Sequence, residues 1–531
     1  MVTMAATVNK FIKRDTSLPM SHFGRLASIV SVFCAAAYAP VAQGIDWRFE
    51  PSVGATTTYT DNVRQSASNT EDALILGITP GFSLRSHGSR RIQASLQYGL
   101  SGITRLGGGD ENDLFHNLSA IGKAEIVEDF LYLDGSANIS QELISLLGSG
   151  SDASTNSSNR ATVGTYSLSP NIKKRLGSFA TAQARYTTSG AIFGNNAASN
   201  SNANALSAGV ASGPRFNDLN WRVDYSIRKV NNQDVGDSTF ERIGAQLGYA
   251  ISRQFRIFGT VGLEKNDYLS STKTDGSSYS MGFGWSPTRR TSVEASVGER
   301  YFGRTFSFSG NHRTRISRWN IRYSEDVSDI TQQFLEQGNR VFWICGGSLI
   351  ETPDAAPPVG QTCSVGPISA GQLAQTYASF GVPLSELIAA GLLNVASANG
   401  VFIIKSLTAG VSWDVGRLGF GLSAQDTRRL YQVLSNAEDH IQSVSGTASY
   451  RMTPQTTANT SLSLTRSSFD PALAGGSART DDTLSLSVGV NHRFADKLSG
   501  ALTVRHIQRD SNAANAGYDE NSISATANMR F

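Results

Sequence analysis

The chain has 531 residues, of which 51 are Gly and 17% are charged, and its mean hydropathy is -0.20. Four of the 46 Lys and Arg residues and one of the 43 Asp and Glu residues lie in the first 44 positions, so the rest of the chain carries 42 of each. This balance argues against a nucleic-acid-binding protein, which would show a basic stripe and a high pI.

The first 44 residues have the features of a secretory signal peptide. Lys10, Lys13, Arg14 and Arg25 precede an apolar run at 26–39, and small residues follow as far as position 44. The run is too short to cross a bilayer, and no later segment supplies the roughly 18 consecutive apolar residues of a membrane helix. We therefore expect a signal peptide over residues 1–44.

Residues 45–531 repeat a pattern in which apolar and polar residues alternate. The first three such segments predict strands at about 48–60, 73–86 and 91–104. A strand with one apolar and one polar face produces this period of two, and its two faces average out in a hydropathy profile. We count 22 segments, and 20 to 24 are compatible with the pattern.

Short and long connections alternate between these segments. Tight turns such as 87–90 and 252–254 alternate with polar loops such as 107–113 and 142–160. A β-sandwich and a β-solenoid are alternatives, but a solenoid requires a short internal repeat that the sequence does not show. The pattern predicts an all-β fold, a transmembrane antiparallel up-and-down β-barrel of the bacterial outer membrane, with turns in the periplasm and loops outside. Its expected partners are outer-membrane lipid and the barrel assembly machinery.

One connection, residues 327–400, is far longer than the others. It contains Cys345 and Cys363, the only cysteines after the signal peptide. Outside the cytoplasm such a local pair is expected to form a disulfide, worth on the order of 3 kcal/mol, and two free thiols are the alternative.

The second half of this insertion has two helical signals. Leu373, Tyr377 and Phe380 are spaced as on one helix face, and an apolar run at 384–393 follows Pro383. We therefore predict two short helices, whose apolar faces need cover. The insertion is a candidate for a lumen constriction or lid, and a surface cap with no transport role is the alternative.

The last eleven residues alternate at every step and end on an aromatic residue. Ile523 and Met529 lie in phase with Phe531, and we expect this face to contact lipid while Ser522 and Arg530 face the lumen. We interpret Phe531 as the assembly signal of the closing strand.

The alternation also directs a set of charged side chains into the lumen. A locally basic wall would favour anionic solutes or polymers. Alternatively, the arginines form a hydrogen-bonded ladder with lumen carboxylates and select nothing. The predicted lumen-lining residues are Arg222, Asp224, Arg228, Glu294, Arg300, Arg313, Arg318 and Arg322.

No sequence motif indicates catalysis or a bound cofactor. Walker, HExxH, CxxC and GxSxG motifs are absent from the sequence. The loop 107–113 is rich in Gly and acidic residues and could hold calcium, but a solvated loop is the better explanation. Asp481 and Asp482 have no matching His nearby in sequence. We expect no enzyme activity, no cofactor and no metal site.

Three segments carry a family resemblance: Tyr59-Thr60-Asp61-Asn62, the segment 298–303, and the segment 318–324 (Arg-Trp-Asn-Ile-Arg-Tyr-Ser). They resemble the PEP-CTERM system-associated outer-membrane proteins. The resemblance implies an outer-membrane barrel in bacteria that have an exosortase and an exopolysaccharide locus. That family is uncharacterised and lends no catalytic or binding residues.

Two functional hypotheses follow. The first is a passive conduit for exopolysaccharide or another polar polymer, with exopolysaccharide export components as partners. The second is a structural or surface-display barrel that anchors envelope material and conducts nothing. A barrel enzyme is a third, weaker hypothesis.

Overall fold

The computed structural model describes thirteen segments of the chain: residues 46–89, 91–107, 112–143, 145–148, 159–194, 200–233, 236–270, 273–339, 341–345, 348–352, 363–369, 400–432 and 437–531. The predicted signal peptide and the two helices predicted between residues 373 and 393 lie outside these segments.

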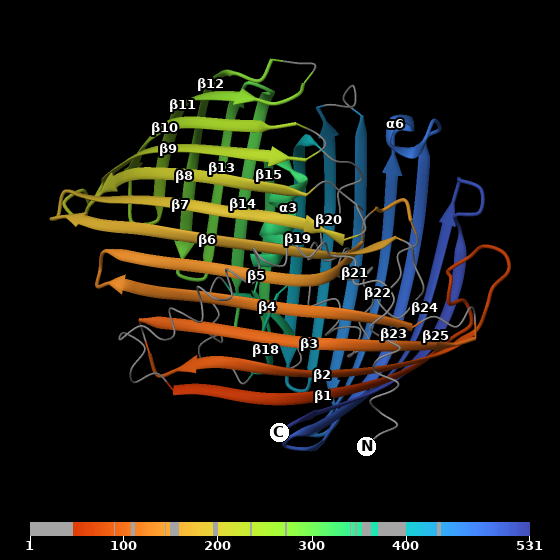
Figure 1. Cartoon of the computed structure of the whole chain (residues 1–531). Coiled ribbons are helices and arrows are strands. Elements are labelled where there is room, and N and C mark those ends of the chain that lie inside the picture. The colour runs from red at the N-terminus through yellow and green to blue at the C-terminus, as the bar shows by residue number, and fades with distance from the viewer. Residues whose placement is uncertain are drawn as a thin grey trace.

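Twenty-two strands form one closed antiparallel sheet (Figure 1). The predicted fold class and strand number are confirmed. The first three strands begin and end within two residues of the predicted positions. The strands are β1 (Asp46–Thr60), β2 (Ala73–His87), β3 (Ile92–Leu106), β4 (Asn112–Val127), β5 (Leu131–Leu143), β6 (Arg160–Leu176), β7 (Ala180–Phe193), β8 (Ser201–Ser212), β9 (Leu219–Asn232), β10 (Ser238–Ala250), β11 (Phe255–Asp267), β12 (Gly276–Thr288), β13 (Thr291–Arg300), β14 (Gly303–Arg313), β15 (Ser317–Asp329), β19 (Val401–Val415), β20 (Leu418–Tyr431), β21 (Glu438–Arg451), β22 (Thr456–Phe469), β23 (Arg479–Ala495), β24 (Leu498–Ser511) and β25 (Tyr518–Arg530).

The two ends of the barrel differ in their connections. At the end where β1 begins and β25 finishes, all ten connections have two to six residues, and we call it the turn end. At the opposite end, the loop end, eleven connections range from two residues between β13 and β14 to 71 residues between β15 and β19. Long loops at one end and tight turns at the other are typical of outer-membrane barrels.

The outward face of the barrel is apolar. Leu247, Val261 and Met281 point away from the lumen and are more than half exposed. Aromatic side chains such as Trp221 and Trp285 lie on this face near the turn end, where an interfacial girdle is expected. A closed barrel that exposes this much apolar surface is stable in a bilayer, where lipid covers the surface and no strand edge is left unpaired. The protein is an outer-membrane β-barrel.

The barrel closes between its first and last strands. β1 pairs with β25 from Ser52, opposite Arg530, to Thr60, opposite Ser522. The Phe531 backbone N–H extends this seam by donating to the Pro51 carbonyl oxygen at 2.9 Å. The predicted closing strand is confirmed, and the function of Phe531 as an assembly signal stays a prediction.

The Tyr59 to Asn62 segment fastens the loop end of the seam. The Asp61 carboxylate accepts the backbone N–H of Asn521 at 2.7 Å and its side-chain N–H at 2.8 Å. Asn62, which is fully buried, donates to the Asp519 carbonyl oxygen at 2.9 Å. These bonds tie the loop after β1 to β25, so the segment has a structural function in closure.

A buried ion pair joins β20 and β21 on the lumen side. Arg429 and Asp439 are 1% and 0% exposed, and Arg429 Nη1 lies 3.1 and 3.2 Å from the two Asp439 carboxylate oxygens. The Tyr431 hydroxyl donates to Asp439 Oδ2 at 2.8 Å. Removing one partner leaves a buried charge without compensation.

We therefore expect Arg429→Met to destabilise the barrel by about 3–5 kcal/mol. The matched control is Arg466→Met, because Arg466 and Asp482 form an ion pair whose side chains are 60% and 48% exposed, and solvent-exposed pairs contribute little to stability. Denaturant unfolding in detergent, monitored by heat-modifiable migration, measures the stability of both variants. Equal unfolding midpoints for the two variants would contradict the prediction.

The insertion contains elements that were not predicted. It begins with helix α3 (Ile330–Asn339), and a small sheet follows with β16 (Val341–Cys345) between β17 (Ser348–Thr352) and β18 (Cys363–Ser369). Cys345 and Cys363 are directly opposite each other in the register of β16 and β18. The disulfide between them stays a prediction.

A readable signal for α3 was missed. The Asp329 carboxylate accepts the backbone N–H of Gln332 at 2.9 Å, which is the bond of an N-cap residue. A second short helix, α6 (Pro471–Ala474), lies in the loop between β22 and β23. No helix in the described segments combines the length and the apolar character needed to cross a bilayer.

Candidate functional site: a helix across the lumen

Helix α3 turns from the end of β15 into the interior of the barrel. Asp329 forms the last residue pair of β15 with β19, opposite Val401. The helix that follows contacts β5, β6 and β7, which lie eight or more strands from β15 around the ring. Figure 1 shows α3 between the front and back walls. The start of the insertion therefore enters the lumen.

An apolar cluster holds α3 there, and we call it the lumen cluster. Ile330 and Phe334 of α3 are buried in it, and the rings of Phe334 and Phe193 lie 5.2 Å apart, edge to face. By strand alternation its wall residues all point inward, and they come from two walls: β6 and β7 on one side, β19 and β20 on the other. The wall residues are Val163, Ala191, Phe193, Phe402 and Tyr431.

These two walls are nearly opposite each other. β6 and β19 are ten strands apart in a ring of 22, and eleven would be diametrically opposite. Burying a Phe side chain contributes about 1.5–3 kcal/mol, so a few residues suffice to hold a helix in this position. The lumen cluster therefore bridges the barrel and occupies its interior toward the loop end.

Polar contacts fix the first turn of α3. Arg228 Nη1 of β9 lies 2.5 Å from Asp329 Oδ2, and the Arg228 guanidinium stands 4.4 Å from the centre of the Phe240 ring. The hydroxyls of Ser201 and Thr331 share a hydrogen bond of 2.6 Å. β8 and β9 thus hold the helix by a small number of specific bonds.

One residue of α3 is poorly accommodated. Gln333 is 4% exposed, and neither its amide oxygen nor its amide nitrogen has a hydrogen-bond partner among the described residues. An unsatisfied buried amide costs about 1–3 kcal/mol. That cost offsets part of the stabilisation from the lumen cluster and lowers the free energy needed to undock the helix.

The predicted lumen charges fall into two groups. Arg228 and Arg300 form buried or half-buried ion pairs near the loop end. Arg300 binds both Glu264 carboxylate oxygens, at 2.8 and 2.9 Å, and Asp326 at 2.8 Å. For these two arginines the ladder interpretation agrees with the structure.

The rest of the predicted set lies on the open part of the wall, nearer the turn end. Arg222 is 3.7 Å from Asp224. Arg313, Arg318 and Arg322 are exposed to the lumen and form no ion pair with any described residue. The structure brings these three together on β14 and β15.

Two aromatic residues beside Arg300 were not identified from the sequence. The hydroxyls of Tyr268 and Tyr301 share a hydrogen bond of 2.8 Å, and both residues lie in loop-end connections. Burial raises the pKa of both hydroxyls, so they stay protonated. They pack in an apolar cluster with Val327 and Ile403.

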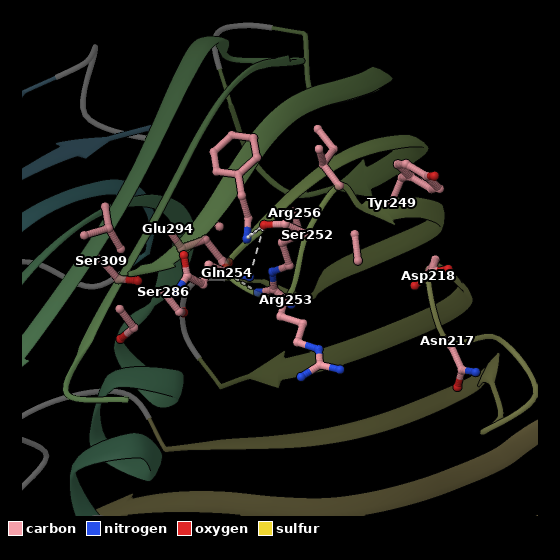
Figure 2. A pocket seen from close by; sticks show the side chains of 16 residues that line it. Asn217, Asp218, Tyr249, Ser252, Arg253, Gln254, Arg256, Ser286, Glu294 and Ser309 are labelled. Carbon is pink, nitrogen blue, oxygen red and sulfur yellow. Dashed lines mark hydrogen bonds and ion pairs between the residues drawn. The ribbon is translucent and has the colours of Figure 1, made fainter. Parts of the chain in front are cut away.

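A cavity of about 950 Å³ opens at the turn end (Figure 2). It is lined by the turn between β10 and β11 and by residues of β12, β13 and β14, including Ser286 and Ser309. Within it, Arg256 forms an ion pair with Glu294. No group of three or more His, Cys, Asp or Glu side chains in the described segments is arranged to hold a metal ion.

No known family model matches the sequence, and no curated protein matches it. Solved structures with a similar arrangement include the siderophore receptor PirA from Pseudomonas aeruginosa, with a TM-score of 0.45, 10% identity, and coverage of 91% of this chain and 80% of that chain. The FrpB iron transporter from Neisseria meningitidis has a TM-score of 0.45, 10% identity, and coverage of 91% and 82%. These similarities are confined to barrel architecture, which the strand register defines independently.

Proposed function

We propose that the protein is a gated conduit of the outer membrane that exports exopolysaccharide or another polar polymer in a PEP-CTERM and exosortase-associated system. Its partners would be the exopolysaccharide export components. The observation that carries the proposal is a polar lumen crossed by helix α3, which is held by few contacts. The lumen supplies the path, and the helix supplies the gate.

The lumen wall suits the passage of a hydrophilic chain. Its inward positions are dominated by small hydroxyl side chains that bond across strands, such as Ser423 with Ser445 at 2.6 Å and Ser169 with Thr187 at 2.9 Å. Such a wall offers hydrogen bonds without large apolar surfaces that would retain a polar polymer.

The contacts of α3 suit a helix that docks and undocks. The lumen cluster and the Arg228 ion pair hold it in place, and the buried amide of Gln333 opposes docking. A gate needs two states whose free energies differ by only a few kcal/mol. The insertion is therefore proposed as a lumen constriction, which is one of the two roles that the sequence predicts for it.

The lumen cluster also favours a second candidate function, a structural barrel. A helix that ties opposite walls together stiffens the barrel whether or not anything passes through it. The two functions differ in one measurable property, because only the conduit gains conductance when the docking of α3 is weakened.

The test is Phe334→Ala, studied in planar bilayers. Truncating a buried Phe costs about 3–5 kcal/mol, which shifts the docked-to-undocked equilibrium by roughly 150- to 5,000-fold. We expect more frequent openings and higher mean conductance than in the wild type.

The matched control is Phe494→Ala, which removes an exposed ring on the outward face near the turn end. It should leave conductance unchanged. Equal, low conductance in Phe334→Ala, in a barrel that keeps normal heat-modifiable migration, would favour the structural function.

A further inference from the structure

We propose that the lumen side of β11 to β15 binds anionic, carboxylate-bearing oligosaccharides through Arg313, Arg318 and Arg322, which we call the arginine wall. The inference names the substrate class of the proposed conduit, and it rests on that function because the ligand must enter the lumen. The arginine wall lies on the open part of the lumen, away from the lumen cluster.

The register brings like charges together. Arg313 and Arg318 are directly opposite each other on β14 and β15, and the next inward pair along is Asn311 with Asn320. Like charges at such positions destabilise a sheet unless something compensates them. Because all three arginines are exposed and form no ion pair with a described residue, an anion in the lumen would supply the compensation.

The spacing fits an extended chain with repeated charges. Arg322 follows Arg318 by four residues, or about 13 Å along an extended strand. Guanidinium groups bind carboxylates through two parallel hydrogen bonds. One chain running along the wall would therefore meet two separate positions for carboxylate groups.

One inward carboxylate in the row of Arg322 is already engaged. Glu294 lies in the same cross-strand row as Arg322, separated by Ser309, and forms its ion pair with Arg256 on the other side. Gly284 lies between Arg256 and Glu294 and leaves room for their ion pair, because a Cβ at this position would be 2.5 Å from Arg256 Nε. Figure 2 shows Arg256, Glu294 and Ser309 around the turn-end cavity.

Neutral groups on the lumen side of β11, β14 and β15 fit a sugar. The amides of Asn311 and Asn320 are exposed, and each offers both a donor and an acceptor for hydroxyl groups. Phe258 faces the lumen between Gly248 and Gly282, and its Cζ would lie 2.6 Å from a Cβ built at Gly282. The half-buried ring therefore lies against the sheet, as a flat apolar platform. A site that recognised only the charge of its ligand would need neither the amides nor the ring.

The position suits a ligand that arrives from the turn end. Ser309 lines the turn-end cavity and is directly opposite Arg322. A polymer entering there would meet the arginine wall before the lumen cluster. The wall would then concentrate the cargo next to the closed gate.

The test is titration calorimetry on the full-length protein in detergent, with oligogalacturonate as the anionic probe. Maltooligosaccharide of equal length is the neutral probe, and polyphosphate is the probe for charge alone. We expect oligogalacturonate to bind more tightly than either, and its affinity to fall as salt increases.

The decisive variant is R313Q/R318Q/R322Q, which keeps a polar lining. We expect at least a 100-fold loss of oligogalacturonate affinity, since each charge-assisted contact is worth about tenfold or more. The matched control is R304Q/R428Q/R466Q, which removes three arginines from the outward face. It should bind as the wild type does, and the single variant Arg322→Gln repeats the test if the triple variant folds poorly.

Absence of binding by the wild type, or wild-type affinity in both lumen variants, would overturn the inference. Equal binding of polyphosphate and oligogalacturonate would overturn the assignment to a glycan. Calorimetry does not require conduction, so the two proposals fail separately. Binding by a barrel that never conducts supports the arginine wall and rejects the conduit, whereas conduction without binding does the reverse.

Discussion

Replacing residues 330–400 by a two-residue Asn-Gly turn is expected to raise single-channel conductance at least about tenfold. The replacement is sterically feasible because Asp329 and Val401 are already the last antiparallel pair of β15 and β19, and Asn-Gly closes such a hairpin. It removes α3, and with it the bridge between nearly opposite walls. A 22-stranded barrel without a plug is wider than the porins, which conduct freely.

The control for this deletion is a loop that contributes no residue to the lumen cluster. Shortening the connection 512–517 between β24 and β25 to two residues serves this purpose, and it should leave conductance as in the wild type. Blockade by added oligosaccharide would then show that the opened path accepts carbohydrate. A barrel without the insertion that folds normally and still does not conduct would reject the conduit and leave the structural function.

Deleting Phe531 is expected to lower the amount of barrel in the outer membrane about tenfold or more. The deletion removes the Phe531 N–H bond to the Pro51 carbonyl oxygen and the exposed aromatic ring at the turn end of the seam. Closure is the step that removes the last strand edges, so a defect there leaves edges free to aggregate. Quantitative blotting of outer-membrane fractions, with and without heating, measures the folded protein.

Two substitutions separate the possible causes. Phe531→Ala keeps the backbone bond and removes the ring, whereas Phe494→Ala removes a ring of similar exposure from the turn end of β23. If the terminal ring is the assembly signal, Phe531→Ala should resemble the deletion and Phe494→Ala should resemble the wild type. Equal losses in both substitutions would indicate a general girdle effect, and normal levels in the deletion would reject the signal.

Local periodicity determined most of the barrel. In β25 the outward exposure of Ile523 and Met529 and the inward burial of Ser522 follow from alternation alone, because a strand has only two faces. The same reasoning placed 22 strands, separated short turns from long loops, and directed Arg313, Arg318 and Arg322 into the lumen. Each of these features depends on neighbours in sequence or on the adjacent strand.

Tertiary structure alone decided which lumen charges are paired and what fills the lumen. Alternation directs Arg228 and Arg300 inward, but their partners Asp329 and Glu264 are 101 and 36 residues away, and nothing in the local pattern identifies them. The start of α3 had a local sequence signal at Asp329. The direction of the helix into the lumen had no such signal. The packing of Phe334 against a wall eight strands away depends on barrel closure, which brings distant strands face to face and leaves no trace in the periodicity of either one.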